Sequence, residues 1–317
     1  AGGRGTRFWP ESTKKKPKQY LSLVGSNSLL QDSLMRFDPL VSKDNRYVVT
    51  IKEQEDLAKE HSNNLVNKNG IIFEPNSRNT APCILLSVAQ LLKQGAGLDE
   101  VVAIMPADHV ILNTKGFQET IQSAISLSKE HSSIVTIGIR PSFPHTGFGY
   151  IHRQSEVQNN CFTVNSFKEK PDQATATSYV QSGEYFWNAG MFVSTIGCLL
   201  EQFKVHAPGI YSFFEGLKDN LNNWDELCHI YSQMPDDSID YAIMEKTKDI
   251  LVIEAKFDWN DLGSWDALES VLPQKQENTV ISEKGSFIDG SSGNIIFAKD
   301  QHVSLVNIKD LIVVSNK

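Results

Sequence analysis

The sequence predicts an α/β fold built on a Rossmann-like, mostly parallel sheet, followed by a small C-terminal β appendage. Up to about residue 270, strand-like and helix-like segments alternate, which is typical of a parallel sheet covered by helices. From about residue 275, short apolar pieces recur without a helix between them, and glycines separate them as turns. We therefore predict a first domain at 1–272 and a second, left-handed β-helix-like domain at 273–317.

Four segments of the first domain show its alternation. Ile84–Leu92 has helical spacing and follows Thr80-Ala81-Pro82, where proline suits a first helical turn. Val101–Met105 is a short apolar run that predicts a buried strand ending at Pro106. Phe117–Leu127 is helical in spacing, and Ile134–Ile139 predicts the next strand. The strand-like pieces of the second domain are Val280-Ile281, Phe287-Ile288, Ile295–Phe297, Val303–Val306 and Leu311–Val314.

Composition and charge narrow the class of protein. The chain has 317 residues, 40% of them hydrophobic, and a net charge of −8, which argues against nucleic acid or an anionic membrane as a general partner. No apolar run approaches the roughly 18 residues of a membrane span. The four cysteines are scattered without metal or redox spacing, so we expect a reducing, cytoplasmic location. Basic residues are concentrated in 1–18, which indicates an anionic small-molecule ligand.

The first seven residues form a glycine-rich loop. Gly2, Gly3 and Gly5 let backbone N–H groups approach an anion without interference from Cβ atoms. The loop lacks the Gly-Lys-Ser/Thr of a P-loop and the spacing of a dinucleotide-binding motif. A strand normally precedes such a loop, so we expect the natural chain to begin before Ala1.

The longer phrase GGRGTRFWPESTKKKPKQ resembles the signature of the sugar-phosphate nucleotidyltransferase family. The resemblance implies that Gly2, Gly3, Gly5 and Thr6 bind a nucleotide. It also implies that Arg7 and Lys18 hold the triphosphate and take part in catalysis. Cations suit this place, because negative charge develops as pyrophosphate leaves the α-phosphorus.

Two aspartates are candidate ligands of a metal ion. Asp108 follows Pro106 at the expected carboxyl end of a strand, where oxygen ligands suit a hard cation. The resemblance implies that Asp108 is a catalytic metal ligand, that Pro106 lies at the nucleotide, and that Asp261 is the second ligand. Spacing alone leaves Asp258 open as an alternative to Asp261. The implied cofactor is Mg²⁺, and His109 after Asp108 resembles the branch of the family that acts on mannose.

The segment Glu74–Pro82 resembles the nucleotide motif of that branch, which assigns Glu74, Arg78, Asn79 and Thr80 to nucleotide binding. A carboxylate suits guanine, whose N1–H and N2–H₂ form a paired donor edge. We therefore interpret Glu74 as the residue that reads the base.

Three further segments resemble the sugar-binding motifs of the family. They imply that Gly147, Glu169, Lys170 and Asn188 bind the sugar phosphate, with Lys170 also catalytic. Neighbouring residues on a strand point to opposite faces, so Glu169 and Lys170 need a bulge or the end of a strand to reach one site. We assign structural duties to Asp240 and Glu245.

The resemblance implies transfer of a nucleotide from GTP to mannose 1-phosphate, with release of pyrophosphate. One alternative is the same chemistry with another sugar 1-phosphate or nucleotide. Another is a catalytically silent protein that binds sugar nucleotides and regulates a partner. An acyltransferase built on a β-helix would need a longer repeat array. We expect a homodimer, for which the β appendage offers an assembly surface.

Overall fold

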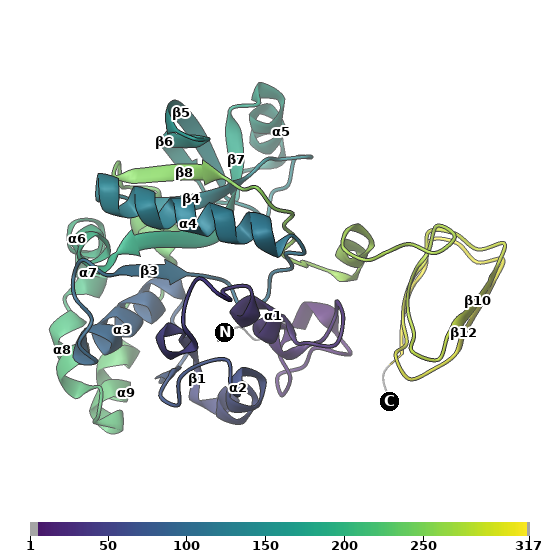
Figure 1. Cartoon of the computed structure of the whole chain (residues 1–317), viewed down its shortest axis with the longest axis horizontal. Coiled ribbons are helices and arrows are strands. Elements are labelled where there is room, and N and C mark those ends of the chain that lie inside the picture. Colours follow the sequence, from purple (N-terminus) through teal and green to yellow (C-terminus); the bar gives the residue numbers. More distant parts are fainter. Residues whose placement is uncertain (1–5, 316–317) are drawn as a thin grey trace.

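The computed structural model describes residues 6–315 and contains one large sheet, a two-stranded sheet and a C-terminal β segment (Figure 1). The large sheet has the strand order β3-β7-β4-β8-β6-β5. Its strands are β3 (Val101–Ile104), β4 (Ile134–Ile139), β5 (Tyr150–Gln158), β6 (Cys161–Lys168), β7 (Tyr185–Thr195) and β8 (Ile250–Glu254).

The α/β class is confirmed, but the prediction of a mostly parallel sheet is wrong. Within this sheet only β4 and β8 pair in parallel. The long strand β7 runs antiparallel between β3 and β4, and β5 and β6 form an antiparallel hairpin. β3 and β4 run in the same direction and are connected through a helix, but β7 lies antiparallel between them, so the sheet is mixed.

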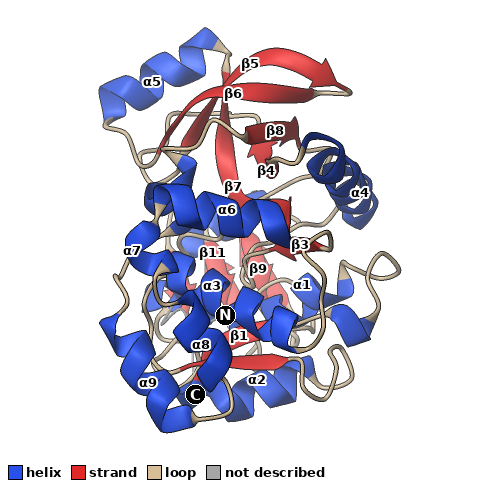
Figure 2. Ribbon diagram, turned by 90° about the vertical axis from the view of Figure 1, so that its left-hand side faces the viewer, coloured by secondary structure: helices blue, strands red, loops and turns tan. Residues whose placement is uncertain are grey.

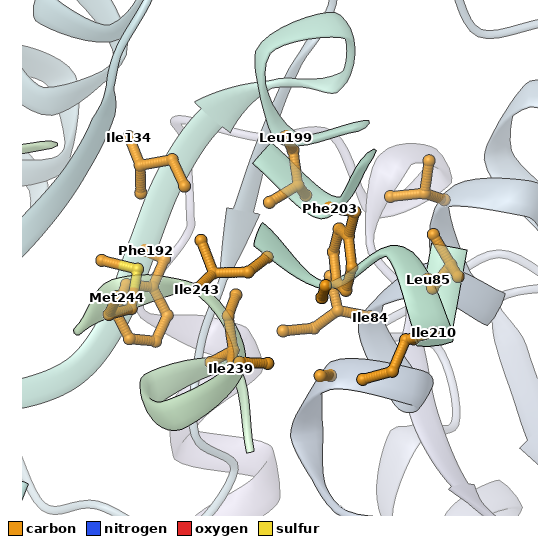
Figure 3. Close-up of a cluster of buried hydrophobic side chains, with 14 of the residues drawn as sticks. Ile84, Leu85, Ile134, Phe192, Leu199, Phe203, Ile210, Ile239, Ile243 and Met244 are labelled. Carbon is orange, nitrogen blue, oxygen red and sulfur yellow. The ribbon is translucent and has the colours of Figure 1, made fainter. Parts of the chain in front are cut away.

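Helices cover both faces of this sheet. Along β8, Ile250 and Val252 face one hydrophobic core while Leu251 and Ile253 face the other, as the period of two in a strand requires. Figure 2 shows α4 on one side of β4 and β8 and α6 on the other. Figure 3 shows part of one core, to which side chains of α3 and α6 contribute. The helices around the sheet are α3 (Thr80–Lys93), α4 (Thr114–His131), α5 (Gln173–Ser182), α6 (Ile196–His206), α7 (Pro208–Tyr211), α8 (Phe214–Asn220) and α9 (Trp224–Gln233).

A smaller parallel sheet pairs β1 (Val48–Ile51) with β2 (Ile71–Glu74), next to α1 (Leu29–Met35) and α2 (Glu55–Ser62). Among the described strands, β1 pairs only with β2 and β3 only with β7. Both β1 and β3 line one cavity of about 1160 Å³. The predicted strand at Val101–Met105 is confirmed, but its predicted burial is wrong: it is half-buried and Ala103 is exposed. The edge without a partner strand accounts for this exposure.

Five short strands form the C-terminal segment, at the right of Figure 1. They make two parallel sheets, in which Thr279, Ile295 and Ile312 align in one and Ser286 and Val303 align in the other. No helix within the described range 6–315 is long and apolar enough to cross a membrane. The strands are β9 (Thr279–Ile281), β10 (Ser286–Asp289), β11 (Ile295–Phe297), β12 (Val303–Val306) and β13 (Ile312–Val314).

Candidate active site

The candidate site lies where the chain leaves β3. The segment after β3 pairs with the segment after β8 through Val110 and Asn260, whose N···O distances are 2.9 and 3.1 Å. This pairing brings Asp108 and Asp261 onto neighbouring stretches of chain. The Nζ of Lys18 lies 3.1 Å from Oδ2 of Asp108 and also donates to the backbone carbonyl of Asp261. Three residues that the sequence predicted for one site are thus in contact.

In the Lys18–Asp108 pair the Lys18 side chain is only 8% exposed, whereas the Asp108 side chain is 36% exposed. Burial raises the pKa of Asp108, but the positive charge of Lys18 and the hydrogen bond from Lys18 lower it by more. The net pKa of Asp108 is therefore below its ordinary value. Asp108 is consequently an anion at neutral pH, as a cation ligand must be.

Arg7 and Asp261 both lie near Gly263. A Cβ atom placed on Gly263 would be 4.0 Å from Nη1 of Arg7 and 3.6 Å from Oδ2 of Asp261. Nearby, the indole N–H of Trp265 donates to the carbonyl of Trp9 at 3.1 Å and ties this segment to the chain after Arg7. Thr6 begins a short 3₁₀ turn, whereas Gly2, Gly3 and Gly5 lie outside the described residues.

Asp258 and Asp261 make different contacts. The two carboxylate oxygens of Asp258 accept from the backbone N–H groups of Leu112 and Asn113, at 2.8 and 2.6 Å. Asp258 therefore fixes the chain at the start of α4. Asp261 instead contacts Lys18 through its backbone carbonyl and lines the cavity.

His109 is fixed by Trp259, whose indole N–H donates to Nδ1 of His109 at 3.1 Å. Burial lowers the pKa of His109 to about 4, so the ring is neutral at pH 7. With Nδ1 accepting a hydrogen bond, the ring proton is assigned to Nε2, which lies 4.0 Å from Oδ1 of Asp108. The imidazole thus presents a donor to the carboxylate without adding charge.

The residues predicted to bind the nucleotide base hold two distant segments together. Glu74 is buried, and its Oε2 accepts from the hydroxyl of Tyr231 at 2.6 Å. Burial raises the pKa of Glu74. Arg78 donates to the carbonyls of Met234 and Ser232, so its guanidinium is engaged with backbone.

The two residues after Arg78 also make hydrogen bonds within the protein. The side chain of Asn79 caps α3, and the hydroxyl of Thr80 accepts from the backbone N–H of Ile239 at 2.8 Å. Like Glu74 and Pro106, Asn79 and Thr80 line the cavity.

Glu169 and Lys170 follow the end of β6 at Lys168. Lys170 has a φ of +47°, and its Nζ lies 2.9 Å from Oε1 of Glu169. This left-handed turn lets neighbouring side chains meet. A Cβ on Gly149 would lie 2.4 Å from Oε2 of Glu169, so glycine makes room for this carboxylate.

Gly147, Glu169 and Asn188 line the same cavity as Asp108 and Asp261. The backbone N–H of Gly147 donates to Nδ1 of His145 at 3.0 Å. Asn188 lies on β7 near the bulge between Thr136 and Gly138, where the register with β4 shifts. Residues from the predicted base, metal and sugar motifs thus line one cavity, whereas Arg7, Lys18 and Lys170 are not among its lining residues.

Sequence reasoning missed two residues, one that contacts a lining residue of this cavity and one that lines it. Tyr231 contacts Glu74 from α9, and no motif or spacing around it could have shown this. Asp240 lines the cavity beside Glu169, although its motif was interpreted as structural. Across residues 6–315, no group of three or more His, Cys, Asp or Glu side chains is placed to hold a metal ion by itself.

Comparison with known proteins shows the family of this chain. The family model for nucleotidyl transferases matches residues 1–278. The mannose-1-phosphate guanylyltransferase of Escherichia coli is 36% identical over 332 residues, covering 100% of this chain and 68% of its own length. A putative mannose-1-phosphate guanylyltransferase of Vibrio cholerae is also 36% identical, over 323 residues, with the same coverage.

A solved structure gives the same result in three dimensions. The structure described as a mannose-1-phosphate geranyltransferase from Thermus thermophilus superposes with a TM-score of 0.89 at 32% identity. The superposition covers 100% of this chain and 90% of that one.

The chain therefore belongs to the nucleotidyltransferase family of enzymes. Within that family, the relatives that match this chain over its whole length include mannose-1-phosphate guanylyltransferases. Those enzymes belong to sugar-nucleotide biosynthesis.

Proposed function

We propose that the protein transfers GMP from GTP to mannose 1-phosphate and so makes GDP-mannose and pyrophosphate. The observation that carries this proposal is the contact of Lys18 with Asp108 and Asp261 in a cavity that Glu169 and Asn188 also line. Relatives that match this chain over its whole length are named for this activity, which supports the choice of substrates.

The proposed step is an in-line displacement at the α-phosphorus of GTP. An oxygen of the phosphate of mannose 1-phosphate forms the new P–O bond, and the bond to the β-phosphate breaks with pyrophosphate as leaving group. The attacking phosphate is anionic at neutral pH, so no general base is required. Positioning and charge neutralisation then supply the rate enhancement. Arg7, Lys18 and Lys170 are the cations we assign to this task.

The carboxylates fit a magnesium ion. Mg²⁺ is usually held by one or two protein carboxylates together with substrate phosphates, and Asp108 and Asp261 provide that number. When bound, the ion would neutralise charge on the triphosphate. Lys18 holds Asp108 ionised and in place.

We further propose that Glu74 reads guanine and that Gly2, Gly3, Gly5 and Thr6 cradle the phosphates. Arg78, Asn79 and Thr80 support this part of the site through the backbone contacts described above. We place the boundary between catalytic and C-terminal domains at 272/273 and propose that the two parallel C-terminal sheets form successive turns of a β-helix. A cytoplasmic homodimer completes the proposal, and light scattering on the purified protein would measure its mass.

The test of the reaction is pyrophosphate release in Mg²⁺ with each common ribonucleoside triphosphate, dTTP and a panel of sugar 1-phosphates. Release confined to GTP with mannose 1-phosphate supports the proposal. Release with a different pair retains the mechanism but overturns the assignment of Glu74 and the sugar. No release with any pair, while GTP still binds, would indicate a silent regulator.

A further inference from the structure

The sugar side of the cavity contains one carboxylate for which the predicted motifs give no binding role. Asp240 begins a π-helical turn (Asp240–Met244) and lines the cavity with Glu169, Asn188 and Gly149. Single π-helical turns are rare and occur frequently at functional sites. The position of Asp240 therefore calls for a specific role.

The hydrogen bonds of Asn188 direct attention to Asp240. The Nδ2 of Asn188 donates to Oδ1 of Asp240 at 3.0 Å. Its Oδ1 accepts from the backbone N–H of Gly190 at 3.1 Å and from the hydroxyl of Thr136 at 3.2 Å. A side-chain amide has one acceptor oxygen and two N–H donors, so the acceptor of Asn188 is occupied. Asn188 is thus arranged to hold the carboxylate of Asp240.

The other groups around Asp240 make this wall rich in acceptors. Glu169 pairs with Lys170, and the backbone N–H of Glu169 donates to Oε1 of Glu245 at 2.9 Å. Burial and the charge of Glu169 raise the pKa of Asp240 to about 6, while Lys170 and Asn188 lower it. A half-buried carboxylate beside another carboxylate gains from added hydrogen-bond donors. The hydroxyl groups of a sugar are donors of that kind.

We propose that Asp240 is a sugar-binding residue that accepts hydrogen bonds from hydroxyl groups of the sugar 1-phosphate, and that Asn188 is a positioning residue that holds Asp240. This inference rests on the proposed function, because it takes the ligand to be a sugar 1-phosphate. It reverses the order expected from the sequence, in which Asn188 contacts the hydroxyl and Asp240 is structural. Selectivity among sugars then depends on Asp240, since a site built to bond a hydroxyl disfavours analogues that lack it.

The experiment compares wild-type protein and Asp240→Asn with mannose 1-phosphate and its 2-, 3-, 4- and 6-deoxy analogues. We expect Asp240→Asn to lower kcat/KM for mannose 1-phosphate by roughly 10- to 100-fold, the range of a hydrogen bond to a charged group. For the analogue that lacks the contacted hydroxyl, the substitution should leave kcat/KM nearly unchanged. Asn188→Ala should show the same pattern among the analogues with a smaller loss.

The control is Asp236→Asn, which removes an exposed carboxylate four residues earlier in the chain and should leave every ratio unchanged. An equal loss for all five sugars, or no loss for any, would overturn the proposal.

Failure of the proposed function can be distinguished from failure of this inference, because it would be seen in the activity of the wild-type protein, without any variant. Calorimetric titration of the same five sugar phosphates gives the comparison of wild type and variant without turnover. If the wild-type protein prefers another sugar 1-phosphate, the deoxy series of that sugar replaces the mannose series. Absence of binding by every sugar phosphate to the wild-type protein would overturn the inference as well.

Discussion

At the scale of single residues, the Lys18–Asp108 pair carries the sharpest prediction. Asp108→Asn keeps the shape of the side chain but removes the charge opposite the buried ammonium of Lys18. We expect turnover to fall by at least about a hundredfold, the usual effect of removing one preorganised electrostatic contact. The fold should persist, because the amide oxygen can still accept from Lys18. Pyrophosphate release and circular dichroism measure the two effects.

Asp258→Asn is the matched control for Asp108→Asn. Asp258 lies on the neighbouring segment but accepts from backbone N–H groups at the start of α4. It should lower the melting temperature while leaving most of the turnover. Near-normal turnover in Asp108→Asn would rule out its assignment as a metal ligand.

Gly149 makes a second prediction at this scale. A methyl group there would lie 2.4 Å from Oε2 of Glu169, so Gly149→Ala should displace that carboxylate. We expect KM for the sugar phosphate to rise about tenfold, as for the loss of one hydrogen bond, with little change in KM for GTP. Gly209→Ala, at a glycine where the new Cβ has no neighbour within 4 Å, is the control. Equal KM values in the two variants would contradict the prediction.

Asp240 predicts a dependence of stability on pH. Its pKa in the folded protein is about 6, raised above its ordinary value by burial and by Glu169, with Lys170 and Asn188 acting oppositely. The folded state therefore holds this proton more tightly than the unfolded state. The stability that Asp240 contributes is present below about pH 4 and is lost as the pH rises through about 6. The melting temperature of Asp240→Asn minus that of the wild type should therefore rise as the pH increases from about 4 to about 7.5. A difference that stays constant with pH would contradict the raised pKa of Asp240.

At the scale of elements, the sequence predicted local segments well and their partners poorly. Ile134–Ile139 is a strand with the predicted bounds, and all five C-terminal strands lie at the predicted apolar pieces. The antiparallel course of β7 was not predictable, because a strand buried on both faces has the same apolar pattern in either direction.

The same distinction applies to the site. Motifs predicted that Lys18, Asp108 and Asp261 share a site, because each lies in a segment with its own recognisable pattern. Tyr231 has no such pattern, and its contact with Glu74 depends on how α9 packs against β2. The hydrogen bonds from Arg78 to the carbonyls of Met234 and Ser232 likewise result from tertiary packing.

This packing of α9 against β2 leads to a prediction for the base. Tyr231→Phe removes the hydroxyl that donates to Glu74 at 2.6 Å and frees the buried carboxylate to turn. We expect KM for GTP to rise about tenfold and selectivity against other triphosphates to weaken, with kcat largely retained. Tyr211→Phe on α7, whose ring packs near Phe214, is the control. A lower melting temperature without a change in base selectivity would show that Tyr231 is only structural.

At the scale of the whole molecule, the C-terminal strands share a hydrophobic cluster with the segments that carry the site. Phe297 on β11 packs against Trp265 with ring centroids 5.0 Å apart, and Trp265 packs against Phe8 at 4.8 Å. Phe8 follows Arg7 directly. In addition, Lys299 donates to the backbone carbonyl of Ser22. The C-terminal strands therefore pack against the chain around Arg7.

Phe297→Ala tests this coupling between the C-terminal strands and the site. Removing a fully buried phenyl ring should cost about 3–5 kcal/mol of unfolding free energy. The space left by the phenyl ring would allow Trp265 to move, and with it Phe8 and the chain beside Arg7. We therefore also expect KM for GTP to rise in the protein that remains folded. Phe287→Ala on β10 is the control, since Phe287 is 54% exposed and its loss should change neither stability nor KM appreciably. Denaturant unfolding and steady-state kinetics on both variants separate the two effects. If Phe297→Ala lowers stability but leaves KM for GTP at its wild-type value, the C-terminal strands stabilise the protein without positioning Arg7.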